Sequence, residues 1–227
     1  MSVFVTNMPK RRFGAIDIVI IAFIFVLLYA ALHLGAGMSV PFSPEDRVDI
    51  SLDPAMLPHY AGRSLLRMFA AFGASLGFTL VYGYIAAKST PAAKVLVPLL
   101  AIVQSVPVLG FLSATISAFM ALFPGSLLGV ELASIFAIFT GQAWNMTFSF
   151  YNSLKTIPKD LEEAAAVLRL NWWQRFIRLE LPFSGIGLVW NSMLSFGGGW
   201  FFLAASEAIS VLGERIRLPG VGSYLAL

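Results

Sequence analysis

Residues 155–182 read KTIPKDLEEAAAVLRLNWWQRFIRLELP, and this stretch decides how the rest of the chain is interpreted. It holds five of the fifteen basic and four of the twelve acidic residues of a 227-residue chain, and hydrophobic runs lie on both sides of it. A polar, helix-forming segment between two membrane spans must lie at the water interface, because lipid offers its polar groups no partners. The stretch is therefore predicted to be open to a soluble partner.

The first half of the stretch is predicted to form a short helix. Pro158 suits a first helical turn, and Asp160 with Glu163 fits a capping pair. One apolar stripe follows at helical spacing, formed by Leu161, Ala164, Ala165 and Leu168. Two of these four side chains are alanines, so we expect a shallow surface that a partner can approach closely.

The second half predicts another short helix. Asn171 can cap its start, with Gln174 three residues further on. Pro182 ends the run. One face of this helix is formed by Trp173, Phe176, Ile177 and Leu181.

The stretch resembles the EAA loop in the permease subunits of bacterial ABC importers, whose pattern is E-A-A-x3-G-x9-I-x-L-P. The positions that match this pattern are Glu163, Ala164, Ala165, Leu179, Leu181 and Pro182. Arg169 stands where the family has glycine, and Leu179 stands where it has isoleucine. Glycine enters the left-handed region freely and arginine does not, so we expect the turn to be built around Asn171 instead.

In that family the loop is the coupling element that docks into a groove of the ATPase subunit. The resemblance therefore assigns ATPase coupling to the matched positions and to Arg169. The local chemistry alone leaves another interpretation open. An amphipathic hairpin could rest on the bilayer surface with its basic residues facing anionic lipid.

Composition places the chain in the membrane. It is 58% hydrophobic and 12% charged with a mean hydropathy of +0.82, whereas soluble domains are about 25% charged. The absence of cysteine excludes disulfides, thiolate chemistry and cysteine metal sites, and two histidines are too few for a histidine cluster. We expect no metal site and no cofactor on this chain.

Five hydrophobic runs predict an all-α bundle of about five transmembrane helices. Residues 1–15 form a tail, 16–34 the first span, 35–62 a loop, and 63–227 a permease core that contains the coupling loop 155–182. The first run gives about 28 Å of helix, enough to cross a core of ~30 Å. A signal peptide is the rival interpretation, but the run is longer than usual and further spans follow. The later runs cover residues 63–87, 95–123, 127–150 and 183–205.

Three features within the spans predict local structure. Gly73 and Gly77 form a G-x-x-x-G pair that favours close helix packing. Arg67 lies one turn inside its span, and we expect it to extend outward to water. The glycines 197–199 weaken a helix, so a local break or very close packing is expected there.

The third run is interrupted by Pro98 and Pro107, and the segment 104–108 places polar groups beside a proline. Broken backbone at membrane depth is tolerated where it is buried in protein or lines a cavity. An ordinary proline kink explains the same residues, and both interpretations stay open.

The distribution of basic residues predicts the orientation. With the N-terminus inside, ten Lys and Arg residues lie on the cytoplasmic side and five on the outer side. This excess favours a cytoplasmic N-terminus and places the coupling loop in the cytoplasm. The sequence pI near 9.3 then reflects membrane topology, so no nucleic-acid partner is expected.

Other segments resemble the nitrate, sulfonate and taurine branch of these permeases. They are residues 64–67, 104–108 and the LPG at 218–220. The segment GGGWFFLAASEAIS resembles members in which two permease halves are fused, so the chain could be the first half of such a protein. The resemblance implies a sixth span, which we expect beyond Leu227.

The resemblance implies a solute pathway rather than a reaction. No Walker A motif is present in the sequence, so ATP and Mg²⁺ would be bound by a partner ATPase dimer. Other implied partners are a second permease half or an identical mate, a periplasmic solute-binding protein and membrane lipid. The candidate pathway residues are Gln104, Ser105, Gln142, Asn145 and Asn191. An interhelical hydrogen bond is the alternative role for each of them.

Two other classes of function stay open. A membrane-embedded enzyme needs convergent acidic, basic or metal-binding groups, and the acidic residues Asp17, Glu131 and Glu207 all lie near span ends. A structural or assembly protein would carry no solute.

Overall fold

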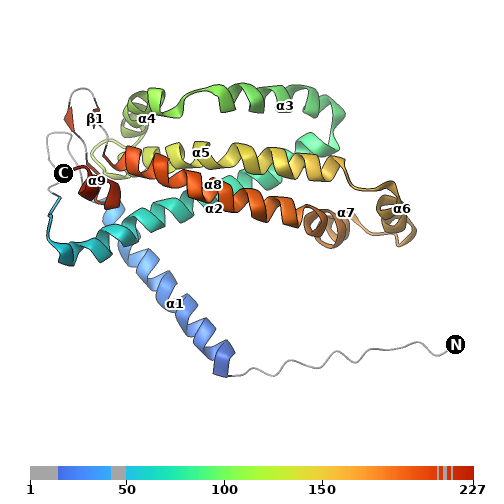
Figure 1. Cartoon of the computed structure of the whole chain (residues 1–227), viewed down its shortest axis with the longest axis horizontal. Helices are drawn as coiled ribbons and strands as arrows, with labels where there is room; N and C mark the ends of the chain where they lie inside the picture. Colours follow the sequence, from blue (N-terminus) through green and yellow to red (C-terminus); the bar gives the residue numbers. More distant parts are fainter. Residues whose placement is uncertain (1–14, 42–49, 209, 212–213, 216) are drawn as a thin grey trace.

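The computed structural model describes residues 15–41, 50–208, 210–211, 214–215 and 217–227. Three long helices, α2 (Leu57–Lys88), α5 (Leu128–Lys155) and α8 (Leu181–Glu207), run side by side as a bundle with α5 in contact with both neighbours (Figure 1). The predicted tail up to residue 14 and residues 42–49 of the predicted outer loop lie outside the described residues.

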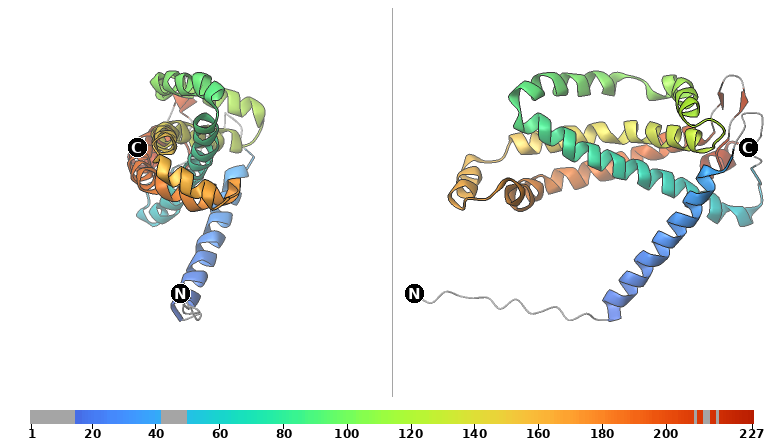
Figure 2. Two further views of the ribbon diagram at one scale, coloured as in Figure 1. Left: turned by 90° about the vertical axis from the view of Figure 1, so that its right-hand side faces the viewer. Right: turned by 180° about the vertical axis from the view of Figure 1, so that it is seen from behind.

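Helix α1 (Ala15–Ala36) stands apart from this bundle and meets α2 only near its own C-terminal end (Figure 2). Its apolar side chains are exposed along the helix, including Phe25 and Tyr29. An apolar helix with no protein cover fits a membrane span in contact with lipid.

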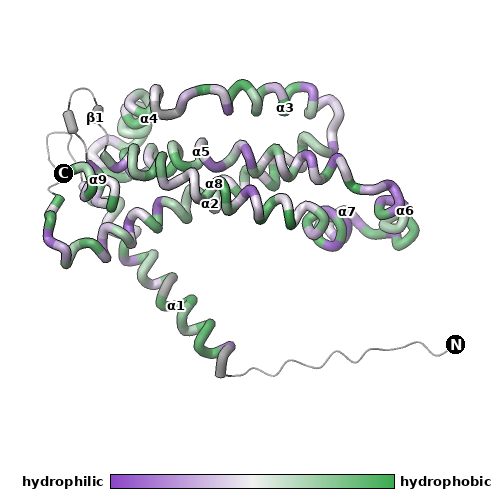
Figure 3. The backbone as a smooth tube through the Cα atoms, viewed as in Figure 1, coloured by the Kyte–Doolittle hydropathy of each residue, from purple (hydrophilic) through white to green (hydrophobic). Residues whose placement is uncertain are grey.

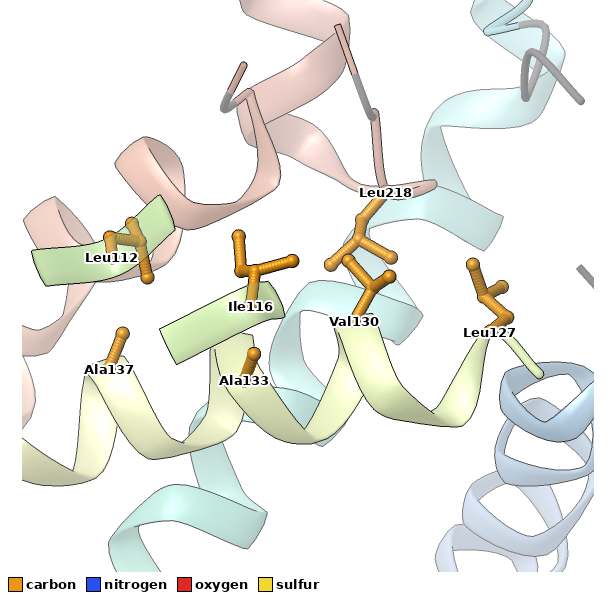
Figure 4. Close-up of a cluster of buried hydrophobic side chains, with 7 residues drawn as sticks. All are labelled: Leu112, Ile116, Leu127, Val130, Ala133, Ala137 and Leu218. Carbon is orange, nitrogen blue, oxygen red and sulfur yellow. The ribbon is translucent and has the colours of Figure 1, made fainter. Parts of the chain in front are cut away.

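Helices α3 (Thr90–Ser105) and α4 (Val108–Leu122) are bent by 107° relative to each other, at a break that contains Pro107. Pro98 lies within α3 and does not end it. Helix α4 packs on α5 through an apolar cluster that Leu218 completes (Figure 4). The members of this cluster are Leu112, Ile116, Leu127, Val130, Ala133, Ala137 and Leu218.

Short elements connect the long helices. A 3-10 turn, η1 (Gly37–Ser39), follows α1, and a second, η2 (Pro54–Met56), precedes α2, which begins six residues before the predicted span. The hairpin between α5 and α8 contains α6 (Lys159–Val167), α7 (Trp172–Arg175) and a π-helical turn, η3 (Phe176–Glu180). Two antiparallel strands of two residues each, β1 (Ser210–Val211) and β2 (Glu214–Arg215), precede α9 (Val221–Leu225).

The chain is an all-α membrane protein, as predicted, with one minute hairpin of strands. By length and apolarity, three helical segments among the described residues could cross a membrane, or four if the bent α3–α4 pair counts as one span. Helix α5 is also long, with 28 residues, but it is less apolar than these segments. Its lower apolarity follows from its inner position, where polar side chains such as Gln142 and Thr147 are buried.

The predicted packing face of Gly73 and Gly77 is wrong for contacts within this chain. A Cβ built on either glycine would have no other described atom within 4 Å. The close approach occurs at Gly83 instead, where a Cβ would lie 2.8 Å from the ring of Phe150. The spacing of two glycines does not say which face of a helix meets its neighbour, and α2 turns a different face toward α5.

Helix α8 is continuous through residues 197–199, so the predicted alternative of a break is wrong there. A Cβ at Gly199 would lie 2.5 Å from Nε2 of Gln142, whereas Gly197 and Gly198 face open space. Close packing is confirmed for one of the three glycines.

The expectation that Arg67 extends outward to water is also wrong. Its side chain is fully buried, and it binds Glu131 of α5 at 2.5 and 2.7 Å and Glu207 of α8 at 2.6 Å. Arg63 adds a bond of 2.6 Å to Glu131. We call Arg63, Arg67, Glu131 and Glu207 the α9-end cluster. Two carboxylates neutralise the two arginines, so these charges need no water.

This cluster also holds the C-terminal segment on the bundle. Glu207 accepts bonds from the hydroxyl of Ser64 at 2.6 Å and from the backbone N–H of Gly222 at 2.7 Å. The backbone N–H of Val221 donates in turn to Ser64. Residues 64–67 and 218–220, which the sequence resemblance singled out separately, therefore meet around one carboxylate.

Candidate coupling hairpin and solute pathway

The hairpin of residues 155–182 extends from the end of the bundle opposite α9 (Figure 1). Hydrophilic residues gather on α6 and α7, in contrast to α1 (Figure 3). The sequence-predicted coupling residues are thus brought to one end of the molecule, where Leu181 and Pro182 begin α8 and the others lie beyond the ends of the long helices.

Helix α6 begins differently from the prediction. The backbone N–H groups of Leu161 and Glu162 donate to the carbonyl of Pro158 at 3.1 and 3.3 Å, and no side chain caps the helix. The capping pair of Asp160 and Glu163 is therefore wrong, because the helix starts at Lys159 and places both residues inside it.

The turn after α6 occurs at the position of the family glycine. Arg169 has a φ of +48°. Its N–H donates to the carbonyl of Ala166 at 3.0 Å, and the N–H of Leu170 donates to that of Ala165 at 3.1 Å. These are the two bonds of a Schellman motif, which satisfy the free carbonyls at a helix end. The predicted shift of the turn to Asn171 is wrong, since these bonds offset the strain of a left-handed arginine.

The predicted cap of the second helix is confirmed. The Asn171 side chain accepts from the N–H of Gln174 at 2.8 Å, and the Gln174 side chain accepts from the N–H of Asn171 at 3.1 Å. This reciprocal pair is a capping box, and it fixes where α7 starts.

The matched EAA positions differ in exposure. Ala165 is buried, while Glu163 and Ala164 are exposed. Neighbouring apolar side chains are open as well, with Val167 82% and Leu168 71% exposed. The predicted stripe is therefore divided, because Ala165 seats the helix and the other positions form a free surface.

The second part of the motif anchors the hairpin. Leu179 and Leu181 pack against a buried cluster that includes Met146 and Phe150 of α5. Pro182 does not end the helical run as the sequence predicted, because α7, the π-helical turn and α8 form one continuous helical segment, Trp172–Glu207, that passes through it. Glu163 and Ala164 of the motif are therefore exposed, whereas Leu179 and Leu181 anchor the hairpin on the bundle.

A group of charges that the sequence did not predict lies at the base of the hairpin. Oε1 of the buried Glu180 accepts from Nζ of Lys88 at 2.5 Å and from Nε of Arg175 at 2.9 Å. Arg175 also binds Glu162 at 2.6 Å. We call Lys88, Glu162, Arg175 and Glu180 the hairpin cluster. It lines a pocket of about 610 Å³ between the hairpin and the ends of α2 and α5.

Three of the five candidate pathway residues line pockets. Gln104 and Asn145 face a pocket of about 320 Å³ that also includes Pro107 and Trp144. Asn145 and Asn191 face a second pocket of about 450 Å³. Pro107 lies at the break between α3 and α4, which favours a cavity-lining break over an ordinary kink. The second pocket is completed by Phe148, Ser149, Asn152, Ser153 and Thr156.

The other two candidates lie elsewhere. The hydroxyl of Ser105 donates to the carbonyl of Ile102 at 2.6 Å. Gln142 is fully buried, and its Nε2 lies 3.2 Å from Sδ of Met68. Its Oε1 has no hydrogen-bond partner among the residues that the structure describes. Gln142 thus fits the alternative role of an interhelical contact.

A bundle of long membrane helices that presents an EAA hairpin at one end defines a permease subunit of an ABC importer. Residues 79–224 match the family described as binding-protein-dependent transport system inner membrane component, and the chain belongs to this family. It is similar to the nitrate import permease protein NrtB of Leptolyngbya laminosa, at 26% identity over 198 residues. The aligned region covers 82% of this chain and 68% of NrtB.

The family match confirms the resemblance to binding-protein-dependent permeases, and the similarity to NrtB supports the nitrate branch. The chain is a multi-pass inner-membrane transport subunit. A permease of this class works with an ATPase and with a solute-binding protein.

Proposed function

We propose that this chain forms one half of the solute pathway of an importer for nitrate or a similar small anion, and that its hairpin couples the pathway to ATP hydrolysis on a partner. One observation carries the coupling role. The EAA positions Glu163 and Ala164 are exposed at the end of the bundle, while Leu179 and Leu181 of the same motif pack inside it.

The chemistry of α6 supports docking into a partner groove. Ala164 is small, and Val167 and Leu168 add exposed apolar surface on the same short helix. Burial of apolar surface contributes about 25 cal/mol per Å². Glu163 offers a charge for a polar group of the partner, and the Arg169 turn ends the docking helix sharply.

The lining of the two pockets suits weak binding of a small solute. Their lining supplies amides, hydroxyls and aromatic rings, and none of the lining residues is charged. Amide N–H groups can donate to an oxyanion without a fixed counter-charge. Nitrate is the solute named for the relative, and the solute-binding protein would supply most of the specificity.

The assembly follows from the same proposal. An ATPase dimer binds ATP and Mg²⁺, a second permease half or an identical copy completes the pathway, and a periplasmic protein delivers the solute. The excess of basic residues supports a cytoplasmic position for the N-terminus and the hairpin. In this chain, which has no cysteine, a single cysteine at Ser89 should be protected from an impermeant thiol reagent in intact cells.

The experiment is co-purification of the ATPase together with nitrate uptake in cells. Ala164→Asp should abolish both while the permease stays in the membrane, because added volume and charge block docking without disturbing the bundle. Thr90→Asp is the matched control, since it adds a carboxylate at an exposed position near the same end of the bundle. Undiminished ATPase association in Ala164→Asp would favour a hairpin that rests on the bilayer surface.

A further inference from the structure

We propose that Glu180 is a positioning residue that transmits movement of the hairpin to both α2 and α8, through the π-helical turn on which it lies. This inference rests on the proposed coupling function. It concerns the base of the hairpin, which the EAA pattern leaves unspecified.

The π-turn makes the central contact possible. The N–H of Leu181 donates to the carbonyl of Phe176, five residues earlier, which is the bond of a π-helix. Residues five apart lie about 140° from each other around an α-helix with 3.6 residues per turn, so their side chains point apart. The wider turn brings Arg175 within 2.9 Å of Glu180. Conversion of the turn to α-helix would separate the two side chains.

The two cations and two carboxylates of the hairpin cluster balance in charge, but one buried carboxylate oxygen is left unpaired within the described part of the chain. Oε1 of Glu180 accepts from both cations, while its buried Oε2 has no hydrogen-bond partner among the described residues. An unsatisfied buried acceptor is costly, so a second arrangement that pairs Oε2 is favoured by its hydrogen bond. Lys88 and Arg175 are each 33% exposed and therefore have room to move between the two oxygens.

The three partners belong to three parts of the molecule. Lys88 is the last residue of α2, Arg175 ends α7 of the hairpin, and Glu180 immediately precedes α8. Arg175 is tied to the docking helix through Glu162. A tilt of α6 on docking therefore pulls on Arg175, and one carboxylate passes that displacement to two helices of the core. In this proposal the cluster has a second arrangement in which a cation binds Oε2, and docking of the partner biases the balance between the two.

The experiment uses the whole importer, permease with ATPase and binding protein, reconstituted in lipid vesicles. It measures nitrate imported per ATP hydrolysed for Glu180→Gln, Lys88→Met and Lys88→Arg. We expect the ATPase to stay bound and to hydrolyse ATP in Glu180→Gln, while import per ATP falls at least about fivefold, the lower end of typical coupling free energies. Lys88→Met should show a smaller fall, and Lys88→Arg should retain the normal ratio.

Lys94→Met is the matched control for Lys88→Met, because it removes an exposed lysine near the same end of the bundle, outside the hairpin and the hairpin cluster. A normal ratio in Glu180→Gln would overturn the positioning role. Loss of both Glu180→Gln and Lys88→Met from the membrane would overturn it as well, since the cluster would then hold the fold. Failure of the proposed function is distinguishable, because it would appear as an Ala164→Asp permease that still binds the ATPase.

Discussion

Two groups of four charges lie at opposite ends of the same three helices, and they differ in burial. In the α9-end cluster the side chains of Arg63 and Arg67 are 7% and 0% exposed, and those of Glu131 and Glu207 are 1% and 0% exposed. In the hairpin cluster Lys88 and Arg175 are 33% exposed and Glu162 is 43% exposed around a buried Glu180. The same kinds of ion pair are sealed at one end and open to water at the other.

The difference suggests a division of labour between the ends. Arg67 donates to two carboxylates from different helices through its rigid fork, so the α9 end has one arrangement. At the hairpin, two cations share one carboxylate oxygen and water can replace either of them. We infer that the α9 end holds the bundle together while the hairpin end can rearrange.

The largest effect is expected for Arg67→Met. Removing one partner of a buried ion pair leaves uncompensated charge and typically costs about 3–5 kcal/mol. Thermal unfolding in detergent should detect this loss, and Arg178→Met is the control, since it removes an exposed arginine outside both clusters. Equal stability of the two variants would contradict the sealed character of the α9 end.

Gly222→Val should have the next largest effect. A Cβ at this position would lie 2.7 Å from Cα of Ala204, so the α9 segment must shift away from α8. Overpacking of this kind costs about 1–3 kcal/mol. Faster proteolysis near the C-terminal segment would report the release of α9, and Gly73→Val, which faces open space, should leave it unchanged.

Lys88→Met should destabilise the protein by only about 1–2 kcal/mol, because Arg175 still donates to Glu180. The number of nitrate ions imported per ATP should fall clearly in this variant, even though its thermal unfolding changes little. A loss of stability as large as that of Arg67→Met would remove the contrast between the two ends.

The smallest effect is expected for Arg169→Gly, which should stabilise the hairpin by up to about 1 kcal/mol by relieving a left-handed arginine. Arg178→Gly is the matched comparison and should destabilise, because Arg178 lies within the continuous helical run. Thermal unfolding of the two variants measures both signs. A loss of stability in Arg169→Gly would mean that the side chain, rather than the backbone, holds the turn.

The features that the sequence predicted well depend on neighbours in the chain. The capping box of Asn171 and Gln174 spans only three residues. A polar segment between apolar runs was also sufficient to predict the hairpin. These signals are local, so the sequence carries them directly.

The features that it missed depend on distant partners. Arg67 is buried because Glu131 and Glu207 lie 64 and 140 residues away in the sequence but beside it in the bundle. The pairing of Arg175 with Glu180 depends on a π-turn, and the spacing of five residues is not one that an α-helix brings together. The left-handed Arg169 was misjudged because its two backbone bonds were not visible in the sequence.

The isolation of α1 has a consequence for how the protein is made. Its apolar side chains already face outward and need no partner, so α1 can enter the bilayer as soon as it leaves the ribosome. Helix α5 carries Glu131 and Thr147 on buried positions, and their side-chain partners Arg67 and Thr79 both lie on α2. Insertion of α5 should therefore wait for its neighbours, which makes biogenesis a cooperative event for the bundle and an independent one for α1.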